Sequence, residues 1–139
     1  MIQLEKVDRI PQIDLAKYSA MEFEQMRGRM EQIERASEGI WVVTANDAVI
    51  IVAGIIRYSL LCPPRLWFMM GREFSSTKVI WHLRILRELL GELDMRYNEV
   101  QTFVEEDWAV GMKFAKFCGF TQTGKITDID GKRYAVMER

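Results

Sequence analysis

Residues 111–120 read GMKFAKFCGF, a helical pattern of lysines and apolar residues that ends in Cys118-Gly119-Phe120. A glycine at this point can take the left-handed backbone conformation that commonly ends a helix. The aromatic residue after it can then anchor a following strand in the core, and GFTQTG supplies the start of that strand. This stretch therefore predicts a junction between a helix at 107–117 and a strand that begins near Phe120.

An amphipathic helix is expected much earlier, in the segment SAMEFEQMRGRMEQIERAS at 19–37. Its apolar residues Phe23, Met26, Met30 and Ile33 recur at steps of three, four and three, which places them on one face of a helix. The glutamates and arginines cover the other face. This stripe predicts a helix packed on the core.

Strands are indicated from Ile40 onward, where the helical spacing of apolar residues gives way to runs of β-branched residues. The stretch 40–59 holds two β-branched runs around Ala45-Asn46-Asp47, which predicts a hairpin. RLWFMM at 65–70 follows two prolines and fits another buried strand. Further strands are expected at 1–7, in EVQTFVEE at 99–106, and in KRYAVME at 132–138 after a turn at Asp130-Gly131.

The longest helix is expected to begin at Ser75 or Ser76, either of which can cap it, and to run to about Tyr97. It carries an apolar stripe at steps of four, three, four and three, formed by Val79, Leu83, Leu86, Leu90 and Leu93. The order of elements becomes β–α–β–β–β–α–β–α–β–β. Such an order predicts an α/β fold with a mixed sheet, in one domain that spans residues 1–139.

Composition excludes several classes of protein. The 139 residues are 49% hydrophobic and 28% charged, which is ordinary for one globular domain, and the net charge of −1 offers no steering toward nucleic acid. Cys62, Cys118 and the lone His82 lack the number and spacing for a zinc site, so no metal is expected.

A soluble, cytoplasmic protein without membrane contact is expected. The charged start MIQLEKVDRI does not fit a signal peptide, and AVIIVAGII at 48–56 is too short to cross a bilayer. The two cysteines show no disulfide framework, as in a reducing compartment.

This order of elements resembles the GNAT superfamily of N-acetyltransferases over nearly the whole chain. The hairpin at 40–57 is similar to the central antiparallel pair of that fold, and the strand–helix unit at 65–97 to its pyrophosphate-binding unit. DWAVGMKFAKFCGF at 107–120 resembles its penultimate helix, which commonly ends in Gly-Phe. The resemblance implies an acetyl-CoA-dependent N-acetyltransferase that acts on a small-molecule or protein amine.

Within the superfamily, the chain is similar to small bacteriophage-encoded GNAT-like proteins, including an internal virion protein. The likeness rests on Trp67 in RLWFMM, on the Leu- and Arg-rich helix WHLRILRELLGELDMRY, and on Lys113 to Lys116 before Cys118-Gly119. It implies an alternative in which a GNAT-fold protein without catalysis serves virion assembly or protein interaction, located in a virion. Members of the superfamily also commonly pair their last strands, which makes a homodimer an expected assembly.

The resemblance assigns cofactor-binding residues to GREFSSTKVIW at 71–81 and to the strand before it. This loop keeps only Gly71 and Arg72 of the glycine-rich pattern, so two interpretations remain open: hydroxyls and cations that bind a pyrophosphate, or ordinary helix caps beside solvated cations. The predicted contacts with acetyl-CoA are the backbone of Trp67, Phe68, Met69 and Met70, together with Arg72, Ser75, Ser76, Thr77 and Lys78.

The general acid and the general base that the resemblance implies do not fall on a matching motif of this sequence. The place of the family's tyrosine acid falls on Ala115, which cannot donate a proton. Glu73 and Glu105 are the candidates for the general base, because both lie near strand ends, and Tyr134 is the substitute acid. For Tyr134, the interpretation as a half-buried structural aromatic is favoured over this catalytic one.

Overall fold

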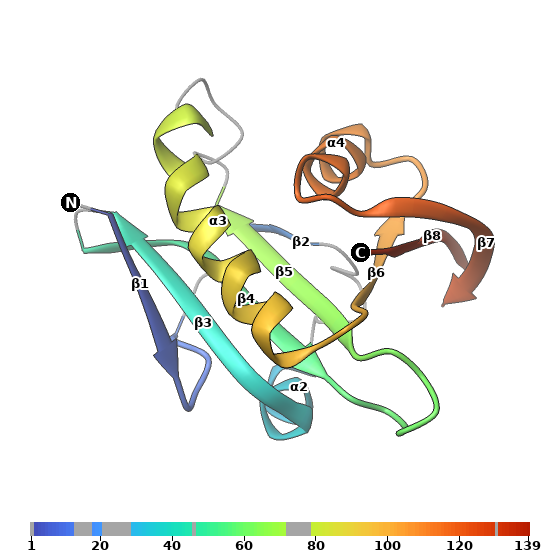
Figure 1. The fold of residues 1–139 in the computed structure, drawn as a ribbon, viewed down its shortest axis with the longest axis horizontal. Helices are drawn as coiled ribbons and strands as arrows, with labels where there is room; N and C mark the ends of the chain where they lie inside the picture. The colour runs from blue at the N-terminus through green and yellow to red at the C-terminus, as the bar shows by residue number, and fades with distance from the viewer. Residues whose placement is uncertain (1, 13–17, 21–28, 46, 72–78, 130) are drawn as a thin grey trace.

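A computed structural model describes residues 2–12, 18–20, 29–45, 47–71, 79–129 and 131–139 (Figure 1). Within these ranges the chain forms strands and helices close to those expected. The strands are β1 Ile2–Val7, β2 Tyr18–Ala20, β3 Ser37–Ala45, β4 Ala48–Ile56, β5 Arg65–Gly71, β6 Gln101–Glu105, β7 Thr121–Ile129 and β8 Lys132–Glu138. The helices are α2 Met30–Ala36, α3 Val79–Arg96 and α4 Ala109–Phe117.

The strands form one mixed sheet in the order β1-β3-β4-β5-β6-β8-β7, with β2 paired separately to β5. Neighbours along β1 to β5 run antiparallel, β5 and β6 run parallel, and β6, β8 and β7 run antiparallel. This confirms the predicted mixed α/β architecture.

One part of the predicted order is wrong. The helix expected over 19–37 is a helix only from Met30 in the described residues, while Ser19 and Ala20 belong to β2 and Ser37 begins β3. Ser19 and Ala20 lie outside the apolar stripe that supported the helix. Their backbone groups pair instead with β5, and this tertiary contact overrides the local preference.

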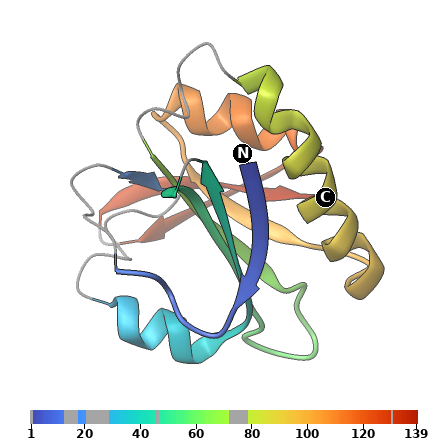
Figure 2. The same cartoon turned by 90° about the vertical axis from the view of Figure 1, so that its left-hand side faces the viewer.

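Two apolar clusters cover the two faces of the sheet. The larger cluster packs α3 and α4 on one face and includes Phe68, Leu89, Phe114 and Phe120. On the other face a smaller cluster around Trp67 and Met69 packs against α2. Figure 2 shows these layers, with the sheet between α2 and the pair α3 and α4.

The helix–strand junction predicted from GMKFAKFCGF is confirmed. Gly119 has a φ of +89°, in the left-handed region, and the Phe120 N–H donates to the Ala115 carbonyl at 3.0 Å. The Phe120 side chain is buried in the larger cluster. The last described residue, Arg139, donates to the Cys118 carbonyl and pairs with Asp94 of α3 at 2.8 Å, so it ties the two helices together.

None of the helices in the described residues is long and apolar enough to cross a membrane.

Candidate functional site

The strands β5 and β6 part soon after they meet. Their register holds one residue pair, Arg65 with Gln101, beside a hydrogen bond of 2.8 Å from the Gln101 N–H to the Pro64 carbonyl. One step further, the buried Thr102 side chain donates to the Leu66 carbonyl at 2.9 Å. A side chain thus adds a hydrogen bond between the two strands just beyond their single register pair. We call the two diverging strands beyond this point the β5–β6 fork (Figure 1).

The free edge of β5 faces the fork. The carbonyls of Pro64 and Leu66 both point toward β6, and backbone direction alternates along a strand, so the N–H and C=O of Phe68 and Met70 point to the same side. Phe68 has a register partner only in β4, on the opposite edge, within the described strands. Its main chain is therefore placed to pair with an extended ligand in the fork.

Part of that edge is already occupied. β2 runs antiparallel to the last residues of β5, with Ser19 opposite Met70 and Ala20 opposite Met69. An extended ligand that used the whole edge of β5 would have to share it with β2 or displace it. No sequence pattern indicated this strand.

The side chains of Trp67, Phe68 and Met69, which were predicted to bind the cofactor from β5, are buried in the core. Trp67 donates to the Ser37 hydroxyl at 3.1 Å and lies across Gly54 of β4, where an added Cβ would meet the indole at 2.3 Å. Phe68 and Met69 are fully buried in the two clusters on opposite faces of the sheet. Of these three residues, only Phe68 turns its main-chain N–H and C=O toward the fork, because those of Trp67 and Met69 face β4.

Of the remaining residues predicted at this end of β5, only Met70 lies within the described part of the chain. Met70 contributes its main chain to β5, and the predicted base Glu73 lies outside the described residues. So do the predicted pyrophosphate-binding residues Arg72, Ser75, Ser76, Thr77 and Lys78.

The structure brings two of the predicted catalytic residues together. Glu105 ends β6 directly opposite Tyr134 of β8, so their side chains share one face of the sheet. The Glu105 carboxylate is about one-third exposed and lies 3.7 Å from the Lys132 ammonium. Tyr134 is only 1% exposed, a burial that suits a structural aromatic.

Helix α4 provides no acid where the resemblance would place one. Ala115 is fully buried in the larger cluster. Burial also raises the pKa of the nearby Cys118 thiol to about 12, so this cysteine stays protonated and unreactive near neutral pH.

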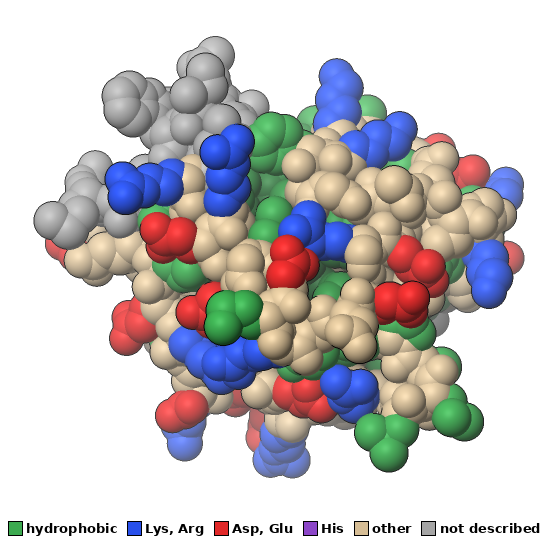
Figure 3. Space-filling model, viewed as in Figure 1, with side chains coloured by type: hydrophobic (Ala, Val, Ile, Leu, Met, Phe, Trp, Pro, Cys, Tyr) green, Lys and Arg blue, Asp and Glu red, His purple; other side chains and the backbone are tan. Residues whose placement is uncertain are grey.

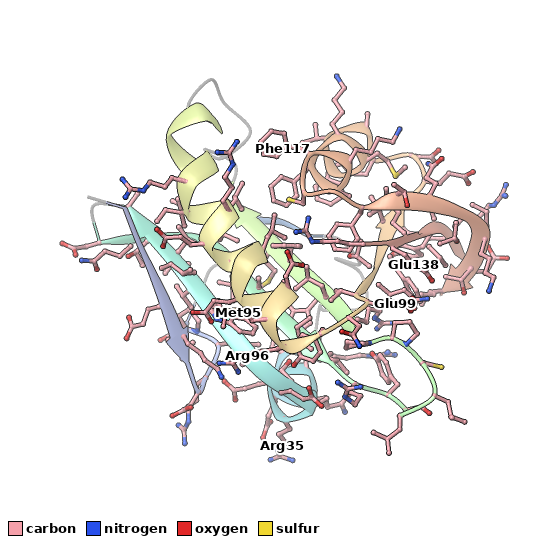
Figure 4. The ribbon with its side chains drawn as sticks, in the orientation of Figure 1. Arg35, Met95, Arg96, Glu99, Phe117 and Glu138 are labelled. Carbon is pink, nitrogen blue, oxygen red and sulfur yellow. The ribbon has the colours of Figure 1, made fainter. Side chains whose placement is uncertain are left out.

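One exposed aromatic was not predicted from the sequence. Phe117 at the end of α4 is 52% exposed, and Figure 4 shows its ring directed toward α3. Its spacing of three residues from Phe114 is typical of a second core position, so the pattern alone gives no sign that Phe117 is exposed. The role of Thr102 was not predicted either. Threonine is common in β-strands, so its presence gives no sign of a hydrogen bond to a neighbouring strand.

Among the described residues, no group of histidine, cysteine, aspartate or glutamate side chains is arranged to hold a metal ion.

Comparisons with known proteins support the fold. No family model and no curated protein matches the sequence. Solved structures do match it. A GNAT family acetyltransferase from Elizabethkingia anophelis with acetyl-CoA bound superposes with a TM-score of 0.70 at 8% identity, over 99% of this chain and 96% of that one. An IAA acetyltransferase from Bacillus cereus gives a TM-score of 0.72 at 9% identity, over 99% and 98% of the two chains. A ribosomal-protein-alanine N-acetyltransferase from Brucella melitensis gives 0.59 at 15% identity, over 85% and 78%.

Proposed function

Because the chain has the fold of the GNAT acetyltransferases, we propose that it binds acetyl-CoA in the β5–β6 fork and acetylates an amine. The observation that carries this proposal is the single-pair contact between β5 and β6, which leaves the main chain of Phe68 facing the fork. A neighbour with the same fold holds acetyl-CoA.

The described residues fit the extended arm of such a cofactor. That arm carries two amides, and amides pair with the edge of a strand in the same way as another strand does. The N–H and C=O of Phe68 are the groups that would hold it. Arg72, Ser75, Ser76, Thr77 and Lys78 remain the proposed pyrophosphate contacts, because a helix N-terminus with nearby cations favours phosphate. When bound, acetyl-CoA supplies an activated acetyl thioester.

The chain's own groups would then position the acceptor and take its proton. Glu105 is the best-placed candidate for the general base, since it is partly exposed at the end of β6, with Glu73 as the other candidate. Tyr134 lies opposite Glu105 and is the proposed proton donor in place of a tyrosine at Ala115. Acyl transfer also gains much of its rate from positioning alone.

Calorimetric titration with acetyl-CoA, and with desulfo-CoA as a second ligand, tests this proposal. We expect micromolar binding that Arg72→Ala or Ser76→Ala weakens by at least about tenfold, as for a lost charge-assisted contact. Arg35→Ala is the matched control, because Arg35 is exposed on α2 and pairs only with its helix neighbour Glu31 among the described residues. Absence of binding at millimolar ligand would overturn the proposal.

A second candidate function is supported by the burial of Ala115 and by the position of β2. These features suit a GNAT-fold protein without catalysis, of the bacteriophage or prophage type, that binds virion or other protein partners. Such a protein would lie in the cytoplasm or in a virion. The same titration separates the two functions, because a scaffold without a cofactor site gives no heat with either ligand.

A further inference from the structure

We propose that the loop between β4 and β5, together with the hollow beside it, binds a second copy of this chain about a two-fold axis. Leu60 is 89% exposed and Leu61 is 95% exposed, at the tip of a loop that carries no other obvious role. Figure 3 shows apolar side chains protruding at the lower right, where this loop lies. The inference is independent of the proposed acetyltransferase function.

The loop holds its leucines in a defined position. The Leu61 N–H donates to the Ser59 hydroxyl at 3.1 Å, and the Cys62 N–H donates to the Ser59 carbonyl at 3.4 Å. At its base, the Arg65 guanidinium lies 4.6 Å from the Tyr58 ring centroid and 4.5 Å from that of Phe103. An apolar tip that is already ordered loses little conformational entropy on binding, which favours association.

A hollow of about 470 Å³ lies next to these leucines. Arg57 and the loop residues 60–64 line it, together with residues 96–99 from the last residue of α3 into the loop that follows. A projection and a hollow on the same face are what a two-fold contact requires, since each copy offers to its partner the surface that it receives. The leucines of one copy would fill the hollow of the other.

The rim of the hollow is also complementary to itself in charge. Arg96 and Glu99 both line it, and neither takes part in an ion pair within the described part of the chain. Figure 4 places Arg96 beside the last turn of α3 and Glu99 between α3 and β6. A two-fold axis would set Arg96 of each copy against Glu99 of the other.

The charge balance favours a second copy over a lipid surface. Arg57, the other cation of the hollow, is already paired with Glu38 at 3.0 Å. Anionic membranes recruit protein surfaces with an excess of basic residues. In the part of the chain that the structure describes, the rim instead carries one cation, Arg96, and one anion, Glu99, outside any ion pair.

Sedimentation velocity, up to about 1 mM protein and with a reducing agent to protect the exposed Cys62, tests the proposal. We expect a concentration-dependent dimer. Leu61→Glu should raise its dissociation constant by at least about tenfold, because it places a charge at the centre of the contact. Ile126→Glu, at an exposed apolar residue of β7, should leave it unchanged.

Charge reversal identifies the contact itself. Arg96→Glu alone and Glu99→Arg alone should each weaken the dimer, because like charges then face each other across the axis. An equimolar mixture of the two variants should restore it, since opposite charges then meet at both contacts. A chain that stays monomeric, a mixture that fails to recover, or a dimer lost with Ile126→Glu instead would each overturn the proposal. So would leucine-dependent binding to anionic vesicles by a monomer.

Discussion

The ring of Phe114 stands edge-on to the ring of Phe68, with 5.3 Å between their centroids and 89° between their planes. This contact joins α4 to β5 at the fork, where the backbone ladder between β5 and β6 has ended. The packing of the two rings therefore supports a part of the sheet that lacks backbone hydrogen bonds between these strands.

Replacing Phe114 by alanine should lower the free energy of unfolding by about 3–5 kcal/mol, the usual cost of removing a buried aromatic ring. Phe117→Ala, three residues further along the same helix, is the control. Because Phe117 is half exposed, its loss should change stability by less than about 0.5 kcal/mol. Urea denaturation followed by tryptophan fluorescence measures both, and equal losses would contradict the assigned roles.

A methyl group at Gly54 should also destabilise the protein. An added Cβ would meet the Trp67 indole at 2.3 Å, so Gly54→Ala is expected to cost about 1–3 kcal/mol through overpacking. Gly91→Ala on α3 has open space around the added carbon and should raise stability by about 0.5–1 kcal/mol. Opposite signs of the change in melting temperature are the expected outcome.

The hydroxyl of Thr102 should matter more than its shape. Thr102→Val keeps the volume but leaves the buried Leu66 carbonyl without this donor, which we expect to cost about 1–3 kcal/mol. Thr102→Ser retains the donor and should recover part of that loss in the same denaturation measurement. A valine variant as stable as the original would show that the hydrogen bond contributes nothing.

Stability should fall at high pH. Burial raises the pKa of Cys118 to about 12 from 9 in the unfolded chain. The folded state therefore keeps a proton that the unfolded state releases, and the free energy of unfolding declines as the pH rises from 9 toward 12. Partial burial and a hydrogen bond to Glu38 raise the pKa of Tyr97 to about 12, which acts in the same direction.

Cys118→Ala should flatten this decline, whereas Cys62→Ala should leave it unchanged because Cys62 is exposed. Chemical denaturation at a series of pH values gives the comparison. If both variants follow the same pH dependence as the original chain, Cys118 is not the group responsible.

If β2 and acetyl-CoA compete for the edge of β5, weakening the pairing between β2 and β5 should strengthen the binding of acetyl-CoA. Ser19 lies opposite Met70, whose backbone groups face the fork, so proline at 19 removes a donor from this pairing. We expect Ser19→Pro to tighten binding of acetyl-CoA by several-fold in calorimetry. Weaker binding would show instead that β2 forms part of the cofactor site.

The sequence predicted a structural feature correctly where the residue type or the hydrophobic pattern agreed with the conformation and burial in the fold. Gly119 needed a left-handed conformation, and the run from Ile50 to Ile56 needed burial on both faces, so both were predictable from residue type and pattern. β2 has three residues, too few to show a period. The role of Thr102 depends on where β5 and β6 part, which is a property of the tertiary fold.

The candidate site was predictable only in part. The sequence named Glu105 and Tyr134 as candidates on separate strands, and the register shows them as direct neighbours. It suggested a half-buried aromatic at Tyr134 but not nearly complete burial, because burial depends on strands from both sides of β8.

The place of β8 between β6 and β7 has a consequence for a shortened chain. β8 supplies the whole antiparallel ladder of β6, and the backbones of Val100 and Arg139 exchange the hydrogen bonds that begin it. A chain truncated before Lys132 would therefore carry β6 with an open edge beside apolar residues that β8 covers in the whole domain. An open strand edge pairs readily with other chains, so such a truncated product should aggregate more readily than the whole domain.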